Sequence, residues 1–177
     1  MYKSKNLINE LGIFFFALIA KLLFVFNSGL KIGSDTAFYL NVTHRLLGLP
    51  SSESIRAIYY IGYPLFMSVI LILFSASSLH LVVVVAQVLL GALSCVFLFK
   101  SILLLIPKRT GVAWILTTVY IFNFDVLQWD PYILTDSFNL SIVVITTYFF
   151  LKLFTRQAEN KIKNWPFLII HFILHSN

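Results

Sequence analysis

The stretch LVVVVAQVLLGALSCVFLFKSILLLI, residues 81–106, decides the fold of this chain. It holds 26 residues. At about 1.5 Å of rise per residue, a helix of that length crosses the roughly 30 Å hydrocarbon core of a bilayer with some tilt. Its only charged residue is Lys100, which lies near one end and can snorkel toward the headgroups. The run therefore predicts a transmembrane helix.

Further apolar runs lie on both sides of this one. The run at 11–26 reads LGIFFFALIAKLLFVF, and its single charge, Lys21, can also snorkel toward one face. Of the 177 residues 59% are apolar and only 11% are charged, whereas soluble domains carry about 25% charged residues. The sequence predicts an all-α polytopic membrane protein with about five transmembrane helices at 11–27, 81–106, 111–127, 137–154 and 165–177, the last one incomplete.

Two shorter helices are expected between the first two long runs. Residues 35–48 are amphipathic, and Ser34 is suited to cap them. Their predicted apolar stripe is Phe38, Val42 and Leu46, and their predicted polar stripe is Asp35, Tyr39 and Thr43. Residues 61–76 form a helix of only about 24 Å, so they either lie at the membrane interface or span a thinned bilayer.

The basic residues indicate the orientation. The net charge is +6, and the charges flank apolar runs, so anionic lipid headgroups are the expected partner rather than nucleic acid. If 61–76 does not span, the N-terminus with Lys3 and Lys5 is cytoplasmic; if it spans, the N-terminus lies outside. The shortness of 61–76 and the two lysines favour the first topology. Residues 128–136 face outside in both.

In the favoured topology most acidic residues gather at the outer face. They are Asp35, Glu53, Asp125, Asp130 and Asp136, five of the seven in the chain. Asp35 in a first helical turn stays ionised, as a general base must, although it could simply cap its helix. Asp136 directly precedes a helix and could be an N-cap, and Asp130 before Pro131 indicates a turn.

Other residues carry less specific signals. Arg56 and Lys31 could bind a phosphate or a lipid headgroup. Cys95 is the only cysteine, so no disulfide framework is possible, and no His/Cys spacing typical of a metal site occurs. No nucleotide-binding loop is present either, so neither a metal nor a cofactor is expected.

The order of several segments carries a resemblance. SDTAFYL at 34–40 is followed by YYIGYPLFMSVILIL at 59–73, by AQVLLGALSCVFLF at 86–99 in a helix that ends in PKR, and by LTDS at 134–137. This order resembles bacterial polytopic glycosyltransferases of the GT-C superfamily, of the protein O-mannosyltransferase and aminoarabinose-transferase type. The resemblance extends from about residue 11 to about residue 154.

The resemblance implies an activity and a set of site residues. A polyprenyl-phosphate-linked sugar would be the donor, and the sugar would pass with inversion to the hydroxyl of an unidentified acceptor at the outer face of the bacterial cytoplasmic membrane. The catalytic residues would be Asp35 and Asp136. The substrate-binding residues would be Tyr39, Arg56, Lys21, Lys31 and Tyr63, the last from the Tyr-Pro-Leu segment.

One departure from the family pattern is the length. Members of this family run to several hundred residues, so the chain is expected to be an N-terminal module that lacks a C-terminal half and has little activity alone. Two other functions stay open: a non-catalytic membrane subunit or scaffold, and a transporter fragment. A transporter predicts ionisable groups near the bilayer midplane, where Lys21 is the only deep candidate in the first helix.

Overall fold

The structure is a computed structural model that describes residues 2–33, 35–50, 61–74 and 78–175. It describes side chains for residues 7–33, 35–50, 61–74 and 78–156. Within these parts of the chain the regular elements are helices, and one isolated β-bridge joins Lys31 to Tyr132. The predicted all-α fold is confirmed.

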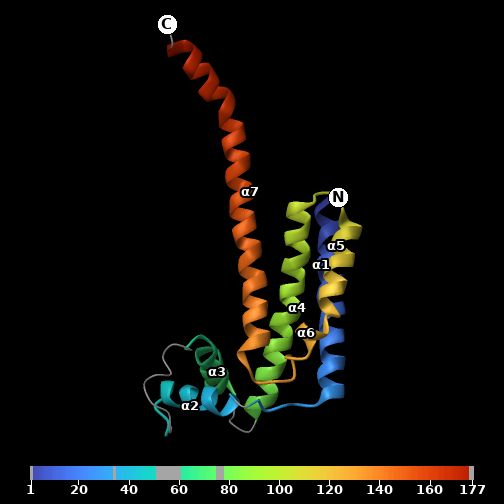
Figure 1. The fold of residues 1–177 in the computed structure, drawn as a ribbon, viewed down its shortest axis with the longest axis vertical. Helices are drawn as coiled ribbons and strands as arrows, with labels where there is room; N and C mark the ends of the chain where they lie inside the picture. Colours follow the sequence, from blue (N-terminus) through green and yellow to red (C-terminus); the bar gives the residue numbers. More distant parts are fainter. Residues whose placement is uncertain (1, 34, 51–60, 75–77, 176–177) are drawn as a thin grey trace.

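Four helices run alongside one another and form the body of the molecule (Figure 1). They are α1 (Tyr2–Ser28), α4 (Leu79–Leu105), α5 (Thr110–Ile121) and α7 (Thr135–His175). α4 packs against each of the other three. Small side chains let the helices approach closely, since Ala17, Ala92 and Ala113 are all fully buried where α1, α4 and α5 meet.

Three of these helices are long and apolar enough to cross a membrane: Leu7–Ser28, Leu79–Leu105 and Thr135–Arg156. Their outward-facing side chains are mostly large and apolar, including Phe15, Leu89 and Phe150. Such surface is stable against lipid and costly against water. The helices therefore have the character of transmembrane segments, but the predicted number of about five spans is not confirmed.

The helix predicted at 111–127 is broken. α5 ends at Ile121, and the single-turn helix α6 (Phe124–Leu127) follows. Asn123 begins α6, and its side-chain oxygen accepts a hydrogen bond from the backbone N–H of Asp125 at 2.9 Å. Asparagine competes with helical backbone bonds in this way, which explains the break. With 12 residues, α5 alone reaches about 18 Å.

The two helices predicted at 137–154 and 165–177 are joined. α7 continues from Thr135 to His175 without interruption, so the predicted separation is wrong. The polar stretch at 155–164 contains neither Gly nor Pro and is rich in Arg, Gln, Glu, Lys and Ala, all good helix formers. Polarity alone did not end the helix.

The two remaining helices lie at the end of the bundle away from the N-terminus (Figure 1). They are α2 (Thr36–Leu46) and α3 (Gly62–Leu73), which pack against each other. α3 reaches about 18 Å, less than a bilayer core, and is not among the three helices long and apolar enough to cross a membrane. That this segment does not span stays a prediction. Of the predicted segment 61–76, residues 75 and 76 are outside the described part of the chain.

The predicted polar stripe of α2 is largely buried. Tyr39 and Thr43 face α3, with exposed fractions of 7% and 0%. The Thr43 hydroxyl donates to the carbonyl of Tyr39 at 2.7 Å and lies 3.3 Å from the carbonyl of Pro64 in α3. Leu46, predicted to be on the apolar stripe, is exposed. Hydrogen bonding to a neighbouring helix therefore overrides the simple apolar stripe.

Candidate functional site

The segment between α6 and α7, residues 128–134, is held by hydrogen bonds from several other elements. The carbonyl of Pro131 accepts from the backbone N–H of Lys31 at 3.0 Å, and the carbonyl of Ile133 accepts from the hydroxyl of Thr36 at 3.1 Å. The Gln87 amide of α4 donates to the carbonyls of Tyr132 and Leu134, at 3.4 and 3.2 Å. Four consecutive carbonyls are thus satisfied, as non-helical backbone inside an apolar bundle requires.

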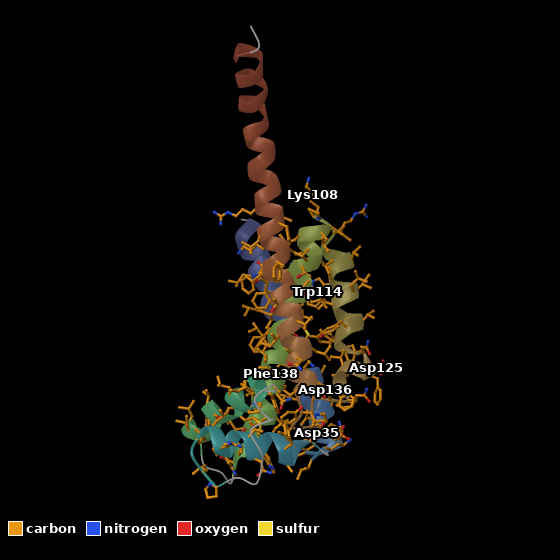
Figure 2. All side chains as sticks on the ribbon, turned by 60° about the vertical axis from the view of Figure 1, so that its left-hand side comes forward. Asp35, Lys108, Trp114, Asp125, Asp136 and Phe138 are labelled. Carbon is orange, nitrogen blue, oxygen red and sulfur yellow. The ribbon has the colours of Figure 1, made fainter. Side chains whose placement is uncertain are left out.

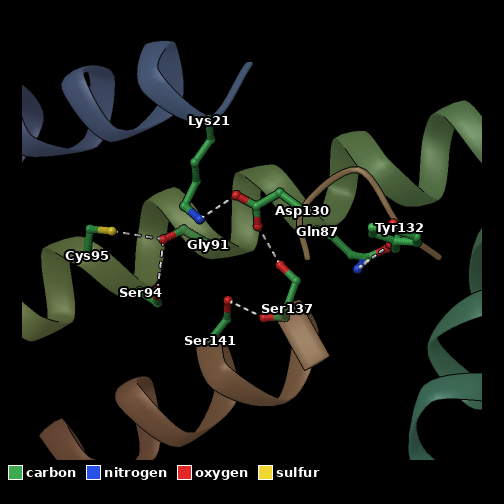
Figure 3. A network of polar contacts seen from close by, with 9 residues as sticks. All are labelled: Lys21, Gln87, Gly91, Ser94, Cys95, Asp130, Tyr132, Ser137 and Ser141. Atoms are coloured by element: carbon green, nitrogen blue, oxygen red, sulfur yellow. Dashed lines mark hydrogen bonds and ion pairs between the residues drawn. The ribbon is translucent and has the colours of Figure 1, made fainter. Parts of the chain in front are cut away.

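A buried ion pair anchors the start of this segment (Figure 3). The Lys21 ammonium of α1 donates to Asp130 Oδ2 at 2.7 Å, and the hydroxyl of Ser137 in α7 donates to Asp130 Oδ1, also at 2.7 Å. Lys21 is 2% exposed and Asp130 is 0% exposed. A charge in such surroundings needs this complete set of partners, because burying it unpaired costs several kcal/mol.

The middle of α4 is shaped to admit Lys21. A Cβ at Gly91 would lie 3.0 Å from Lys21 Cε and 3.2 Å from its Nζ, so glycine makes room for the lysine side chain. Ser94 and Cys95 direct their polar hydrogens back to the Gly91 carbonyl (Figure 3). Since Gly91 is close to the middle of the α4 span, the ion pair lies deep in the bundle.

These positions correct two expectations. Lys21 does not snorkel to a membrane face, because a buried carboxylate within reach is a better partner than a distant headgroup. Asp130 does form part of a turn, but it is buried inside the bundle instead of belonging to the outer acidic surface. Of the other acids expected there, Asp35, Asp125 and Asp136 are exposed at the α2 end, as Figure 2 shows.

Asp35 and Asp136 stand at the starts of two helices that are bonded to each other. Asp35 is the N-cap residue of α2, yet its side chain makes no capping hydrogen bond; it has another interaction. Asp136 lies in the first turn of α7 and is not its N-cap. Thr36, next to Asp35, bonds to Ile133, and the hydroxyls of Tyr39 and Thr135 are 3.4 Å apart. Both carboxylates therefore belong to one end of the molecule and to one bonded unit.

The two helix starts also share an electrostatic feature. The N-terminal end of a helix carries a partial positive charge, which attracts negatively charged groups. Ser34, expected to cap α2, lies outside the described residues, and the cap position is taken by Asp35. The arrangement can therefore present two exposed carboxyl groups to a molecule that approaches the α2 end.

The expected substrate-binding residues have different surroundings. Tyr39 and Tyr63 are buried and stack edge to face, with ring centroids 5.2 Å apart. Burial raises the pKa of the Tyr63 phenol, and Tyr39 acts in the same direction, so Tyr63 stays protonated and donates to Gln87 Oε1 at 3.1 Å. Lys31 is exposed, and its ammonium lies 5.4 Å from the centre of the Tyr132 ring. Arg56 lies outside the described residues, as does Glu53.

An apolar groove lies beside this end of the bundle. It has a volume of ≈ 390 Å³ and is lined only by aliphatic and aromatic side chains of α1 and α4. The lining residues are Leu22, Leu23, Val25, Phe26, Leu81, Val84, Val85 and Val88. A hydrocarbon chain is the ligand that such a lining suits. For a metal ion, the described residues contain no group of three or more His, Cys, Asp or Glu side chains that could hold one.

The pairing of Lys21 with Asp130, at the centre of this arrangement, was not predicted from the sequence. Gln87 and Ser137 were not among the predicted site residues. The available signal was chemical: a lysine, an aspartate and a glutamine all placed within or beside apolar runs, where each needs a partner.

Comparisons of the chain with protein-family models, with curated proteins and with solved structures gave no match in any of the three.

Proposed function

We propose that this chain carries sugar-transfer machinery of the GT-C type, which moves a sugar from a polyprenyl-phosphate donor to an acceptor hydroxyl at the outer membrane face. The observation that supports this most is the pair of exposed carboxylates at the starts of α2 and α7. These helix starts are joined by the bonds from Thr36 to Ile133 and between Tyr39 and Thr135. The apolar groove between α1 and α4 suits the prenyl chain of such a donor.

The proposed orientation places the α2 end outside and the N-terminus in the cytoplasm. Lys108 and Arg109 are exposed in the turn between α4 and α5, at the end opposite to α2 (Figure 2). The exposed acids Asp35, Asp125 and Asp136 lie at the α2 end. This charge distribution is the one that the positive-inside rule favours.

In the proposed reaction, Asp35 acts as the general base. A carboxylate oxygen takes the proton of the acceptor hydroxyl, and the hydroxyl oxygen forms a bond to the anomeric carbon of the sugar. The bond from that carbon to the phosphate oxygen breaks, and the polyprenyl phosphate leaves with the electron pair. Asp136 orients the acceptor or the sugar. Lys31, which is exposed near the α2 end, stabilises the negative charge of the departing phosphate.

Lys31 suits the phosphate better than Lys21 does. The ammonium of Lys21 is already neutralised by Asp130, at 2.7 Å, and its side chain is closed off from the surface. The same closure argues against the transporter alternative. An ion pathway needs ionisable groups that water or a substrate can reach, and both oxygens of Asp130 are already occupied by protein donors.

The test is release of labelled sugar from a polyprenyl-phosphate donor by membranes that contain the chain. Asp35→Asn keeps the size of the side chain but removes the basic oxygen, so the rate should fall by about 10² to 10⁴, the range for a general base. Asp125→Asn is the matched control, because Asp125 is another exposed acid at the same end and should be replaceable. The assay supplies, as a second chain, the C-terminal half that the resemblance to GT-C enzymes implies. Unchanged transfer by Asp35→Asn, or no transfer by the parent chain in that assay, would contradict the proposal.

A further inference from the structure

The buried pair of Lys21 and Asp130 is linked to both exposed carboxylates by short bonded paths. On one side, Asp130 Oδ1 accepts from Ser137, which directly follows Asp136 in the first turn of α7. On the other, the segment 128–134, which contains Asp130, bonds through Ile133 to Thr36, which directly follows Asp35. Figure 3 shows the first of these paths, with Asp130 between Lys21 and Ser137.

We infer that Lys21 and Asp130 are a positioning pair, which fixes the segment 128–134 in the bundle and thereby sets the placement of Asp35 relative to Asp136. Neither residue touches a substrate in this role. The inference builds on the proposed function, because the two carboxylates matter together only if they serve one site. The placement itself is a physical property that can be measured without any donor or acceptor.

The burial of the pair explains why it can hold the segment. If 128–134 withdrew toward the surface, the Lys21 ammonium would remain in an apolar bundle without its carboxylate. Lys21 is 2% exposed and lies against Gly91 in the middle of α4, so its ammonium has little contact with solvent. Withdrawal would also break the bonds to Gln87, Lys31 and Thr36. A neutral pair of side chains would lack the first of these restraints.

The described residues also offer a matched comparison. Lys100 and Glu10 form an ion pair at 3.1 Å, with side chains 31% and 27% exposed. This pair joins α4 to α1, whereas the buried pair joins α1 to the segment 128–134. The ion pair of Lys100 with Glu10 involves neither that segment nor the first turn of α7. Neutralising it should therefore leave the placement of Asp35 and Asp136 unchanged.

The experiment measures cross-linking of Asp35→Cys with Asp136→Cys by a short bismaleimide in native membrane vesicles. Both positions are exposed, and Cys95→Ala removes the only natural thiol, which is buried. A protease site inserted after Lys108, in the turn between α4 and α5, lies between the two cysteines. A cross-linked chain then stays one band after cleavage, and the rate of formation of that band is the readout.

We expect the cysteine pair to cross-link readily in the parent chain. Lys21→Met or Asp130→Asn should slow cross-linking at least tenfold. The double variant Lys21→Met/Asp130→Asn contains no unpaired buried charge, so it should recover the amount of folded protein but not the parent cross-linking rate. This combination separates positioning from folding. Lys100→Met with Glu10→Gln should cross-link at the parent rate.

Several results would overturn the inference. They are slow cross-linking in the parent, a parent rate in the double variant, a double variant that does not fold, and an equal loss of rate in the Lys100 and Glu10 control. Failure of the proposed function would look different. Sugar release would then be absent from the parent, while the dependence of cross-linking on Lys21 and Asp130 would persist.

Discussion

The two ion pairs within the described residues have the same chemistry in opposite surroundings. The Lys21–Asp130 pair is almost completely buried, is 2.7 Å long and is completed by the hydroxyl of Ser137. The Lys100–Glu10 pair is 3.1 Å long and about a third exposed, and its ammonium also lies near the rings of Phe97 and Tyr148. The first pair is part of the internal structure, whereas water or headgroups can replace either partner of the second. Burial therefore decides how much the free energy of unfolding depends on each pair.

The largest effect that we expect concerns the two ends of the bundle. A cysteine at Ala37 in α2 should react with an impermeant thiol reagent in intact cells, whereas a cysteine at Gly111, at the start of α5, should react only after lysis. Both positions are exposed, and the natural Cys95 is buried. The contrast should be all or none, since the bilayer separates the two positions in the proposed topology. Equal labelling of both in intact cells would contradict that topology.

The next largest effect should come from breaking the buried pair. Lys21→Met keeps the length of the side chain but leaves Asp130 in the bundle without its counter-charge. The expected loss is about 3 to 5 kcal/mol in the free energy of unfolding, the range for a buried pair that loses one partner. Denaturant titration of the purified protein in detergent measures it. Adding Asp130→Asn should restore part of the loss, and a stability equal to that of the parent in the single variant would show that the pair is not needed for the fold.

A smaller effect is expected where the buried segment is held by neutral hydrogen bonds. Gln87→Leu keeps the volume of the side chain but leaves the carbonyls of Tyr132 and Leu134 and the hydroxyl of Tyr63 without their partner. The cost should be about 1 to 3 kcal/mol, because buried polar groups are left unsatisfied. The same titration measures it, with Gln128→Leu as the control. Gln128 bonds only weakly to the exposed Asp125, at 3.5 Å, so Gln128→Leu should hardly change the free energy of unfolding.

The helices of the fold could be predicted from the sequence only in part. The long apolar runs predict helices because lipid leaves the backbone no other partner, and α1, α4 and the first part of α7 follow from them. The break after Ile121 and the continuation of α7 past Arg156 depend on single residues and helix propensity, which a hydropathy pattern does not resolve. The short length of α3 also follows from the sequence, whereas its position relative to the membrane stays a prediction.

The site was predictable only in part. The exposed positions of Asp35 and Asp136 follow from their places beside apolar runs. That the two serve one site, as the resemblance to GT-C enzymes implies, stays a prediction. The pairing of Lys21 with Asp130 joins residues 109 positions apart, and no local pattern reports such a contact. The four-residue spacing of Tyr39 and Thr43 could not show that they face α3. A polar stripe at that spacing fits an exposed helix face as well as a buried face that forms hydrogen bonds.

The smallest effect that we expect comes from the exposed pair. Lys100→Met removes the ammonium from Glu10 but keeps an unbranched side chain beside Phe97 and Tyr148, so packing is retained. Glu10 is 27% exposed and can find water or another cation, so the free energy of unfolding should fall by at most about 1 kcal/mol. Raising the salt concentration should shrink even that difference, because exposed charges are screened, while the loss in Lys21→Met should change little. A salt-independent loss in Lys100→Met as large as that in Lys21→Met would mean that burial is not what separates the two pairs.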